Sequence, residues 1–212
     1  MGAAERHPAP GVLVAVRPVV VVSGPHGAGR SELGASVASR LGYALWDREI
    51  LHEIALQTHM SERLFDSLDE HRRNPITEAL STLPGCGPGD SVYVFHLQRT
   101  LRTIAAHGSA VVIGRGAQFV VSEGQALRVR IVSPLGARVR AIMHADTVDE
   151  TQARREIERV DDEHAVFVRQ HYARDLHDVT AYDLLVNTAT LGVEGAASVV
   201  EAACRARFGE AL

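Results

Sequence analysis

Apolar residues along the chain fall into two patterns that alternate from residue 19 onward. Short unbroken runs, such as the four valines at residues 19–22, predict strands that are buried on both faces of a sheet. Between these runs, apolar residues recur every three or four positions, as Leu33, Val37 and Leu41 do, which predicts helices. Alternating strands and helices predict an α/β fold, with a parallel sheet between two layers of helices.

The element boundaries follow from where each pattern starts and stops. The predicted strands cover residues 19–23, 43–46, 110–113, 128–132 and 184–186. The predicted helices cover residues 31–41, 48–58, 61–83, 92–107, 136–172 and 195–207, and the third of these is broken near Pro75. Residues 84–89, rich in glycine and proline, predict a loop. We expect residues 1–18 to form a flexible tail and residues 19–212 to form a single domain.

A glycine-rich segment joins the first predicted strand to the first predicted helix. It reads G-P-H-G-A-G-R-S and has the form G-x-x-x-x-G-[K/R]-[S/T] of a phosphate-binding P-loop. Glycines let backbone N–H groups approach a ligand closely, and successive N–H groups at a helix N-terminus attract phosphate oxygens. Ser31 stands where a hydroxyl would hold Mg²⁺. The predicted ATP-binding residues are Gly24, Pro25, His26, Gly27, Ala28, Gly29, Arg30 and Ser31.

Arg30 occupies the loop position that is usually lysine, whose role is to reach the terminal phosphates. Guanidinium and ammonium groups are not interchangeable, so the substitution bears on function. However, the chain contains no lysine, because all 22 of its basic residues are arginine. The substitution therefore fits the composition of the whole chain. The alternative interpretation of the segment is a glycine turn in some other α/β protein.

Further polar groups follow other predicted strands. Asp47 comes after the second strand, a Gly-Arg-Gly turn around Arg115 comes after the third, and Asn187 and Thr188 come after the last. In open parallel sheets a ligand binds beyond the carboxyl ends of the strands. We therefore expect these groups to meet the P-loop at one edge of the sheet.

Composition restricts the class of protein. The 212 residues are 46% hydrophobic and 23% charged, which is ordinary for one globular domain with a substantial core. The net charge of −4 argues against a nucleic-acid binder. Cys86 and Cys204 fit no ligand spacing, and the 11 histidines match no zinc motif. With no signal peptide or membrane-spanning stretch in the sequence, we expect a cytoplasmic protein with free thiols.

Four segments together resemble the cytidylate kinase and cytidylate-kinase-like family of nucleoside monophosphate kinases. The P-loop is similar to the family's G-P-S-G-A-G-K-[G/S], and residues 45–51, L-W-D-R-E-I-L, resemble F-Y-D-[K/R]-E-[L/I]-[I/L]. Residues 112–116, V-I-G-R-G, resemble V-I-[V/D]-G-R-[G/D], and residues 182–188, Y-D-L-L-V-N-T, resemble Y-[D/H]-L-[V/L]-[L/I]-N-T. The likeness runs from about Val19 to Ala203 in the family's order and spacing.

The resemblance implies a three-layer P-loop kinase fold with a helical acceptor-binding insert, here residues 48–107, and a helical lid, here residues 136–171. It implies transfer of the γ-phosphoryl group of ATP, bound with Mg²⁺, to a small-molecule acceptor, typically CMP or dCMP. Such a reaction depends on positioning and charge neutralisation more than on covalent chemistry. Planar guanidinium groups suit that task because they grip phosphate oxygens in pairs.

The resemblance also implies roles for single residues. Arg115 would hold the acceptor, and Asp47 would face the acceptor or organise Arg115. Arg155, Arg159 or Arg169 would bring lid charge over the transferring group. The residues themselves leave other roles open: Arg115 can brace a turn, Asp47 can cap a helix, and the lid arginines can form an exposed, salt-bridged helix face.

The chain departs from the family pattern at three positions. His164 stands where the lid carries an arginine, His26 replaces a serine of the loop, and Arg30 replaces its lysine. A histidine near neutral pH is mostly uncharged and does not replace a guanidinium. Two other functions therefore stay open at this point. They are a nucleotide-binding regulatory protein with weak or no kinase activity, and a P-loop kinase of another small metabolite.

Overall fold

The computed structural model describes residues 17–47 and 90–209. Within them, five strands form one sheet in the order β2-β3-β1-β4-β5, and all neighbouring strands run parallel. The strands are β1 (Val19–Ser23), β2 (Ala44–Trp46), β3 (Ala110–Ile113), β4 (Ala126–Val132) and β5 (Leu184–Asn187). Each predicted strand is present, within two residues of its predicted ends.

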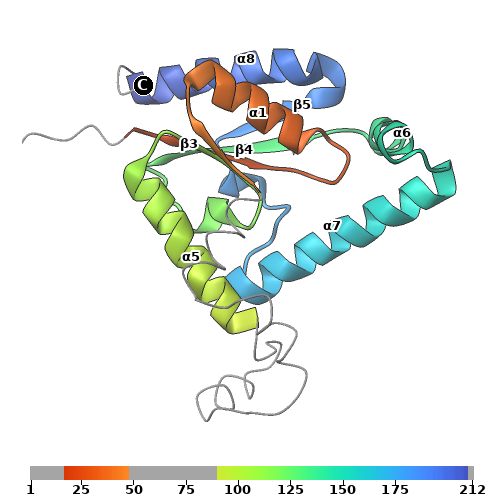
Figure 1. Ribbon diagram of the computed structural model, residues 1–212, viewed down its shortest axis with the longest axis horizontal. Coiled ribbons are helices and arrows are strands. Elements are labelled where there is room, and N and C mark those ends of the chain that lie inside the picture. The colour runs from red at the N-terminus through yellow and green to blue at the C-terminus, as the bar shows by residue number, and fades with distance from the viewer. Residues whose placement is uncertain (1–16, 48–89, 210–212) are drawn as a thin grey trace, which may run out of the picture.

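Helices cover both faces of the sheet, as Figure 1 shows. Helices α1 (Arg30–Leu41) and α8 (Thr188–Phe208) lie on one face, and α5 (Asp90–His107) lies on the other. The valines of β1 divide between the two layers. Val20 and Val22 pack in the cluster that holds α1 and α8, whereas Val19 and Val21 pack with α5. This arrangement confirms the predicted three-layer α/β fold.

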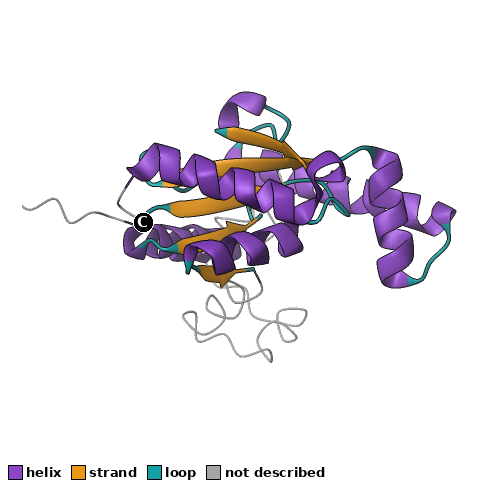
Figure 2. Cartoon of the chain, turned by 90° about the horizontal axis from the view of Figure 1, so that it is seen from above, coloured by secondary structure: helices purple, strands orange, loops and turns teal. Residues whose placement is uncertain are grey.

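The predicted helix over residues 136–172 is in fact two helices, α6 (Leu135–Asp146) and α7 (Glu150–Tyr172). Thr147 ends α6 in a left-handed conformation, and Asp149 starts α7 with a capping box. In that box the Asp149 carboxylate accepts from the Gln152 N–H, and the Gln152 side chain accepts from the Asp149 N–H. The two helices share an apolar cluster of their own and extend from one side of the sheet (Figure 2).

The last helix begins earlier than the pattern predicted. It starts at Thr188 instead of residue 195, because the side chain of Asn187 caps it by accepting from the Ala189 N–H at 3.0 Å. Gly192 interrupts the helix with non-helical angles, which explains why the periodic pattern starts only after it. Asn187 and Thr188 therefore mark the junction between β5 and α8.

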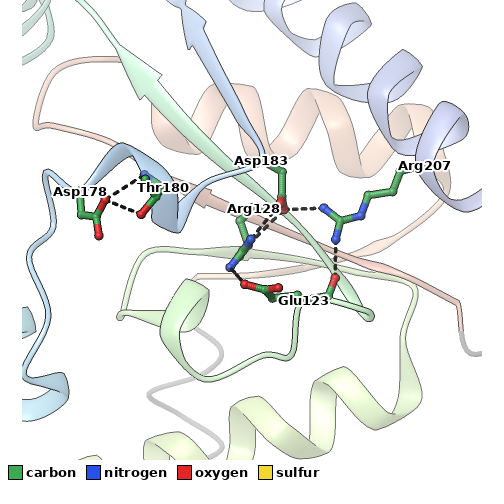
Figure 3. Close-up of polar contacts among 6 residues, drawn as sticks. All are labelled: Glu123, Arg128, Asp178, Thr180, Asp183 and Arg207. Carbon is green, nitrogen blue, oxygen red and sulfur yellow. Dashed lines mark hydrogen bonds and ion pairs between the residues drawn. The ribbon is translucent and has the colours of Figure 1, made fainter.

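A carboxylate network ties the far edge of the sheet together (Figure 3). The Asp183 carboxylate accepts from Arg128 on β4 at 2.9 Å and pairs with Arg207 on α8 at 2.7 Å. Arg128 also pairs with Glu123 at 3.0 Å. Although burial alone would raise it, the pKa of Asp183 falls to about 2 because of the bonds from Arg128 and Arg207.

Several expectations lie outside the described residues. These are the tail up to residue 16, the predicted helices over 48–58 and 61–83, the loop over 84–89, and Cys86. Of the proposed acceptor-binding insert, only residues 90–107 are described, and they form α5. Cys204 is a buried free thiol. Among the helices described, none is both long and apolar enough to cross a membrane.

Candidate functional site

The predicted P-loop connects β1 to α1, as its sequence requires. Gly29 has a φ of 82° and stands immediately before Arg30, the first residue of α1. Gly27 has a φ of +74°, and a Cβ there would lie 3.0 Å from the carbonyl oxygen of Arg138 on α6. On the other side, the Thr188 hydroxyl donates to the Ala28 carbonyl at 2.8 Å. The loop is therefore held between α6 and the start of α8, against a helix N-terminus that attracts anions.

A cavity of about 370 Å³ opens beside this loop, at the carboxyl ends of the strands. Its lining includes Arg30 and Ser31 of the loop, Asp47 after β2 and Arg115 after β3. Helix α7 contributes the remaining wall, including Phe167. The structure thus brings the P-loop, Asp47 and Arg115 together. Asn187 and Thr188 do not line the cavity. Thr188 instead supports the loop through its bond to Ala28, and Asn187 caps α8.

The turn that carries Arg115 is strained. Gly114, Arg115 and Gly116 have φ angles of 70°, 57° and 70°, and the left-handed region costs a residue with a Cβ roughly 1–2 kcal/mol. The Tyr172 hydroxyl, from the end of α7, donates to the Arg115 carbonyl at 2.8 Å and fixes the turn. Strain of this kind gathers at functional sites, and here it presents the Arg115 side chain to the cavity.

Ser31 and Asp47 lie close enough to act together. The Ser31 hydroxyl donates to the Asp47 carboxylate at 3.4 Å, and both side chains line the cavity. Mg²⁺ prefers hard oxygen ligands and is often held by one or two protein oxygens together with substrate phosphates. The pair therefore fits Mg²⁺ bound with a nucleotide.

The arginines of the cavity lack carboxylate partners. Neither Arg30 nor Arg115 forms an ion pair with any of the described residues, whereas Arg138 pairs with Asp161 at 2.6 Å. Burial lowers the pKa of Arg30, against the opposing effect of Asp47. Partly buried guanidinium groups without carboxylates favour an anionic ligand, because such a ligand would offset their charge.

The lid arginines lie elsewhere. Arg155, Arg159 and Arg169 are all exposed on α7 and do not line the cavity. Arg159 pairs with Glu156 and Glu163, each at 2.6 Å, which is the exposed, salt-bridged helix face that the sequence left open. The role of these arginines over the transferring group stays a prediction.

His164 reaches the cavity where the three lid arginines do not. It is half-buried on α7 and lines the cavity together with Arg30 and Ser31 of the P-loop. Burial, and then the positive charges of Arg30 and Arg130, lower its pKa to about 4. The imidazole is therefore neutral at pH 7 and adds no further positive charge to the site.

Pattern analysis missed two residues that join the lid to the loop. The Asp161 carboxylate on α7 accepts from the His26 N–H at 2.7 Å and from the Arg138 guanidinium at 2.6 Å. Arg138 also donates to the His26 carbonyl at 3.2 Å. Neither Arg138 nor Asp161 belongs to a motif, so only the folded structure links them to the loop. Together they dock α6 and α7 on the P-loop backbone.

Comparison with protein families identifies the family of this chain. Residues 19–190 match the Cytidylate kinase-like family, and the chain therefore belongs to it. The cytidylate kinase of Natronomonas pharaonis is 26% identical over 190 residues, which are 89% of this chain and 90% of that protein. The cytidylate kinase of Haloarcula marismortui is 30% identical over 183 residues, which are 85% of this chain and 86% of that protein.

Solved structures support the fold. An uncharacterized protein from Eubacterium ventriosum has a TM-score of 0.68 at 15% identity, with 89% of this chain and 98% of that chain covered. Shikimate kinase from Bacteroides thetaiotaomicron has a TM-score of 0.50 at 13% identity, with 89% and 96% covered. At such identities the likeness concerns architecture alone, and it is the architecture of a P-loop kinase.

Proposed function

We propose that this member of the cytidylate kinase-like family transfers the γ-phosphoryl group of ATP to a nucleoside monophosphate, CMP or dCMP. One observation carries the proposal: Arg30 and Ser31 of the P-loop share a single cavity with Asp47 and Arg115. A donor phosphate on the loop and an acceptor phosphate at Arg115 would meet in that cavity. The names of the curated relatives support the same class of reaction.

The donor half of the site is the P-loop. Its backbone N–H groups and the N-terminus of α1 would hold the phosphates of ATP, and Arg30 would reach the terminal ones. Ser31, with Asp47 beside it, would hold Mg²⁺ bound with the nucleotide. When bound, Mg²⁺ neutralises charge on the phosphate oxygens.

The acceptor half of the site is the Arg115 turn. Arg115 would bind the phosphate of the acceptor, and the strain of its backbone holds it ready for that role. In the reaction, an acceptor phosphate oxygen forms a bond to the γ-phosphorus while the bond from that phosphorus to the β-phosphate oxygen breaks and releases ADP. Arg30 and Arg115 would stabilise the charge on the transferring group from its two sides.

The rest of the fold would exclude water from the site. Helices α6 and α7 span the proposed lid of residues 136–171 and already contact the loop through Asp161 and Arg138. Their closure would prevent transfer to water, which would otherwise turn the kinase into an ATPase. In a closed state Arg155, Arg159 or Arg169 would add positive charge, and residues 48–107 would complete the acceptor pocket.

The test is a coupled ADP-release assay with Mg²⁺ and ATP against CMP, dCMP, UMP, AMP and GMP, with a control that lacks acceptor. We expect turnover that depends on CMP or dCMP. ATP binding without phosphorylation of any of these acceptors would overturn the proposal. The regulatory protein or the kinase of another metabolite would then be the better interpretation, and the neutral His164 in the lid favours the former.

A further inference from the structure

Arg130 on β4 is a buried arginine without a carboxylate partner. Its exposed fraction is 7%, and none of the described residues forms an ion pair with it. Arg128, two residues earlier on the same strand and the same face, pairs with both Glu123 and Asp183. Burying an unpaired charge is expensive, so its persistence at Arg130 needs an explanation that Arg128 does not need.

None of the side chains that bond to Arg130 is a carboxylate. Its Nη1 donates to the Tyr182 hydroxyl at 3.0 Å, and its Nη2 lies 3.4 Å from Nδ1 of His177. Tyr182 donates its own proton to the Leu176 carbonyl at 2.9 Å, so its oxygen is free to accept from Arg130. Gln118 donates to the same hydroxyl at 3.4 Å. The guanidinium carbon also lies 5.2 Å from the centroid of the Tyr182 ring, a cation–π contact that offsets part of its charge. These contacts orient the guanidinium group, but none of them supplies a negative charge.

Arg130 lies directly beside the start of the P-loop. It pairs in register with Ser23, the last residue of β1, and Gly24 follows at once. The Ser23 hydroxyl and the Oε1 of Gln118 are buried, with no hydrogen-bond partner in the part of the chain that the structure describes. Gln118 itself belongs to the short helix that follows the Arg115 turn. Unpaired polar atoms thus gather between the loop and that turn, on the face that α5 covers.

The same guanidinium group acts on the cavity. Arg30, Arg130 and Arg115 all contribute to the low pKa of His164, which lines the cavity wall. The three arginines therefore lie near one imidazole: Arg30 begins α1, Arg115 follows β3, and Arg130 lies within β4, outside the cavity lining. None of the three pairs with a described carboxylate.

We propose that Arg130 is a third anion-binding residue of this site and, with Arg115, binds the phosphate dianion of the acceptor. The inference rests on the proposed function, in which the acceptor is a phosphomonoester. A dianion between the two guanidinium groups would compensate the charge that Tyr182 and His177 leave unbalanced. Arg130 then supplies from the sheet the guanidinium group that position 164 of the lid does not supply.

A purely structural role for Arg130 predicts a different result. If Arg130 only tied β4 to Leu176 and Tyr182, its loss would lower stability and leave acceptor affinity unchanged in the folded variant. The two roles are separated by comparing Arg130→Met with Arg128→Met. The second variant removes a guanidinium group from the same strand and face, but one that two carboxylates already neutralise.

The experiment measures KM for CMP and for ATP, together with the melting temperature, in both variants. We expect Arg130→Met to raise the KM for CMP about 100-fold while the KM for ATP changes less than about twofold, because a buried charged bond to phosphate is lost. Arg130→Lys, which keeps the charge, should recover part of that loss. Arg128→Met should lower the melting temperature with KM for CMP unchanged. An unchanged KM for CMP in folded Arg130→Met would overturn the inference.

A binding measurement separates this inference from the proposed function. Calorimetric titration with CMP, and with inorganic phosphate, needs no turnover. If the wild-type chain phosphorylates no acceptor but Arg130→Met loses phosphate binding, the kinase proposal fails and the anion site stands. If Arg130→Met phosphorylates CMP with a wild-type KM, the anion site fails and the kinase stands. Should Arg130→Met not fold, Arg130→Gln removes the same charge with a polar side chain, and the same outcomes apply.

Discussion

At the scale of single residues, the proposed phosphate recognition relies on arginine, because the chain contains no lysine. Arg30 takes the P-loop position of lysine in a chain whose 22 basic residues are all arginine. Its guanidinium group is half-buried at the cavity and forms no ion pair with a described carboxylate. A planar fork of donors can bind two phosphate oxygens at once, where an ammonium group acts as a point charge.

Replacing Arg30 tests whether the loop binds ATP. We expect Arg30→Ala to weaken ATP binding about 100-fold, because a charged bond to phosphate of about 2–3 kcal/mol is removed. Arg30→Lys is the matched control and should stay within about tenfold of the wild type, since it keeps the charge. Calorimetry with a non-hydrolysable ATP analogue measures both. An ATP affinity that Arg30→Ala leaves unchanged would refute the P-loop assignment.

The pKa of His164 reports the burial and the positive charge around the cavity. Burial, then Arg30 and Arg130, hold its pKa at about 4, below the 6.5 of a free imidazole. Because the unfolded chain binds this proton first, stability falls as the pH drops from 6.5 towards 4, by on the order of 1–3 kcal/mol. His164→Gln should flatten denaturation free energies across that interval. An equally steep decline in the variant would show that other groups cause it.

The same imidazole should also respond to ligands. An anion bound among Arg30, Arg115 and Arg130 would offset the charges that depress the pKa of His164. We therefore expect the NMR titration of His164, assigned with His164→Gln, to shift to higher pH when CMP is added. A titration that CMP leaves in place would mean that the acceptor binds away from these arginines.

At the scale of elements, the Arg115 turn and the end of α7 depend on each other. A Cβ at Gly116 would lie 2.2 Å from the Tyr172 ring, and Gly116 has a φ of +70°. Tyr172 in turn fixes the Arg115 carbonyl. The position of a cavity arginine is thus set by the packing of a lid helix.

Gly116→Ala tests that coupling. We expect a stability loss of about 2 kcal/mol or more, from left-handed strain and from displacement of the Tyr172 ring. Gly42→Ala is the control, because Gly42 has a φ of +67° with no atom within 4 Å of the added Cβ. Gly116→Ala should also raise the KM for CMP, whereas Gly42→Ala should not. Equal losses in both variants would show that strain alone matters and that the contact with α7 does not.

How far the sequence predicts these elements depends on the kind of signal each carries. Short apolar runs mark the strands, so all five could be placed, although only β1 and β3 are buried along their whole length. The break between α6 and α7 carries neither glycine nor proline, and its one local signal is the capping pair of Asp149 and Gln152. Arg130 is a charged residue in a mostly apolar strand, and this can be seen in the sequence. Its lack of a carboxylate partner can be seen only in the folded structure. Asp161 and Arg138 meet the P-loop only through folding.

At the scale of the whole molecule, the chain is a sheet with a loop at its edge and a pair of helices docked on that loop. The docking rests on Asp161, whose carboxylate binds the His26 N–H and the Arg138 guanidinium group at once. Helices α6 and α7 pack on each other through an apolar cluster of their own, and the end of α7 also contacts the core through Phe167 and the Arg115 turn through Tyr172. The bonds of Asp161 add a polar contact that links both helices to the P-loop.

Asp161→Asn should loosen the proposed lid while Arg30, Arg115 and Arg130 stay in the chain. The amide can still accept from His26, but the ion pair with Arg138, whose side chain is only 13% exposed, is lost. We expect ATP hydrolysis without acceptor to rise relative to transfer to CMP, because an open lid admits water to the γ-phosphate. The ratio of ADP release without and with CMP measures this change.

Glu156→Gln, which breaks an exposed pair with Arg159 on the same helix, is the control and should leave the ratio unchanged. If Asp161→Asn instead bound ATP more tightly and the ratio stayed unchanged, the carboxylate would compete with ATP for the P-loop N–H groups and would not hold the lid closed.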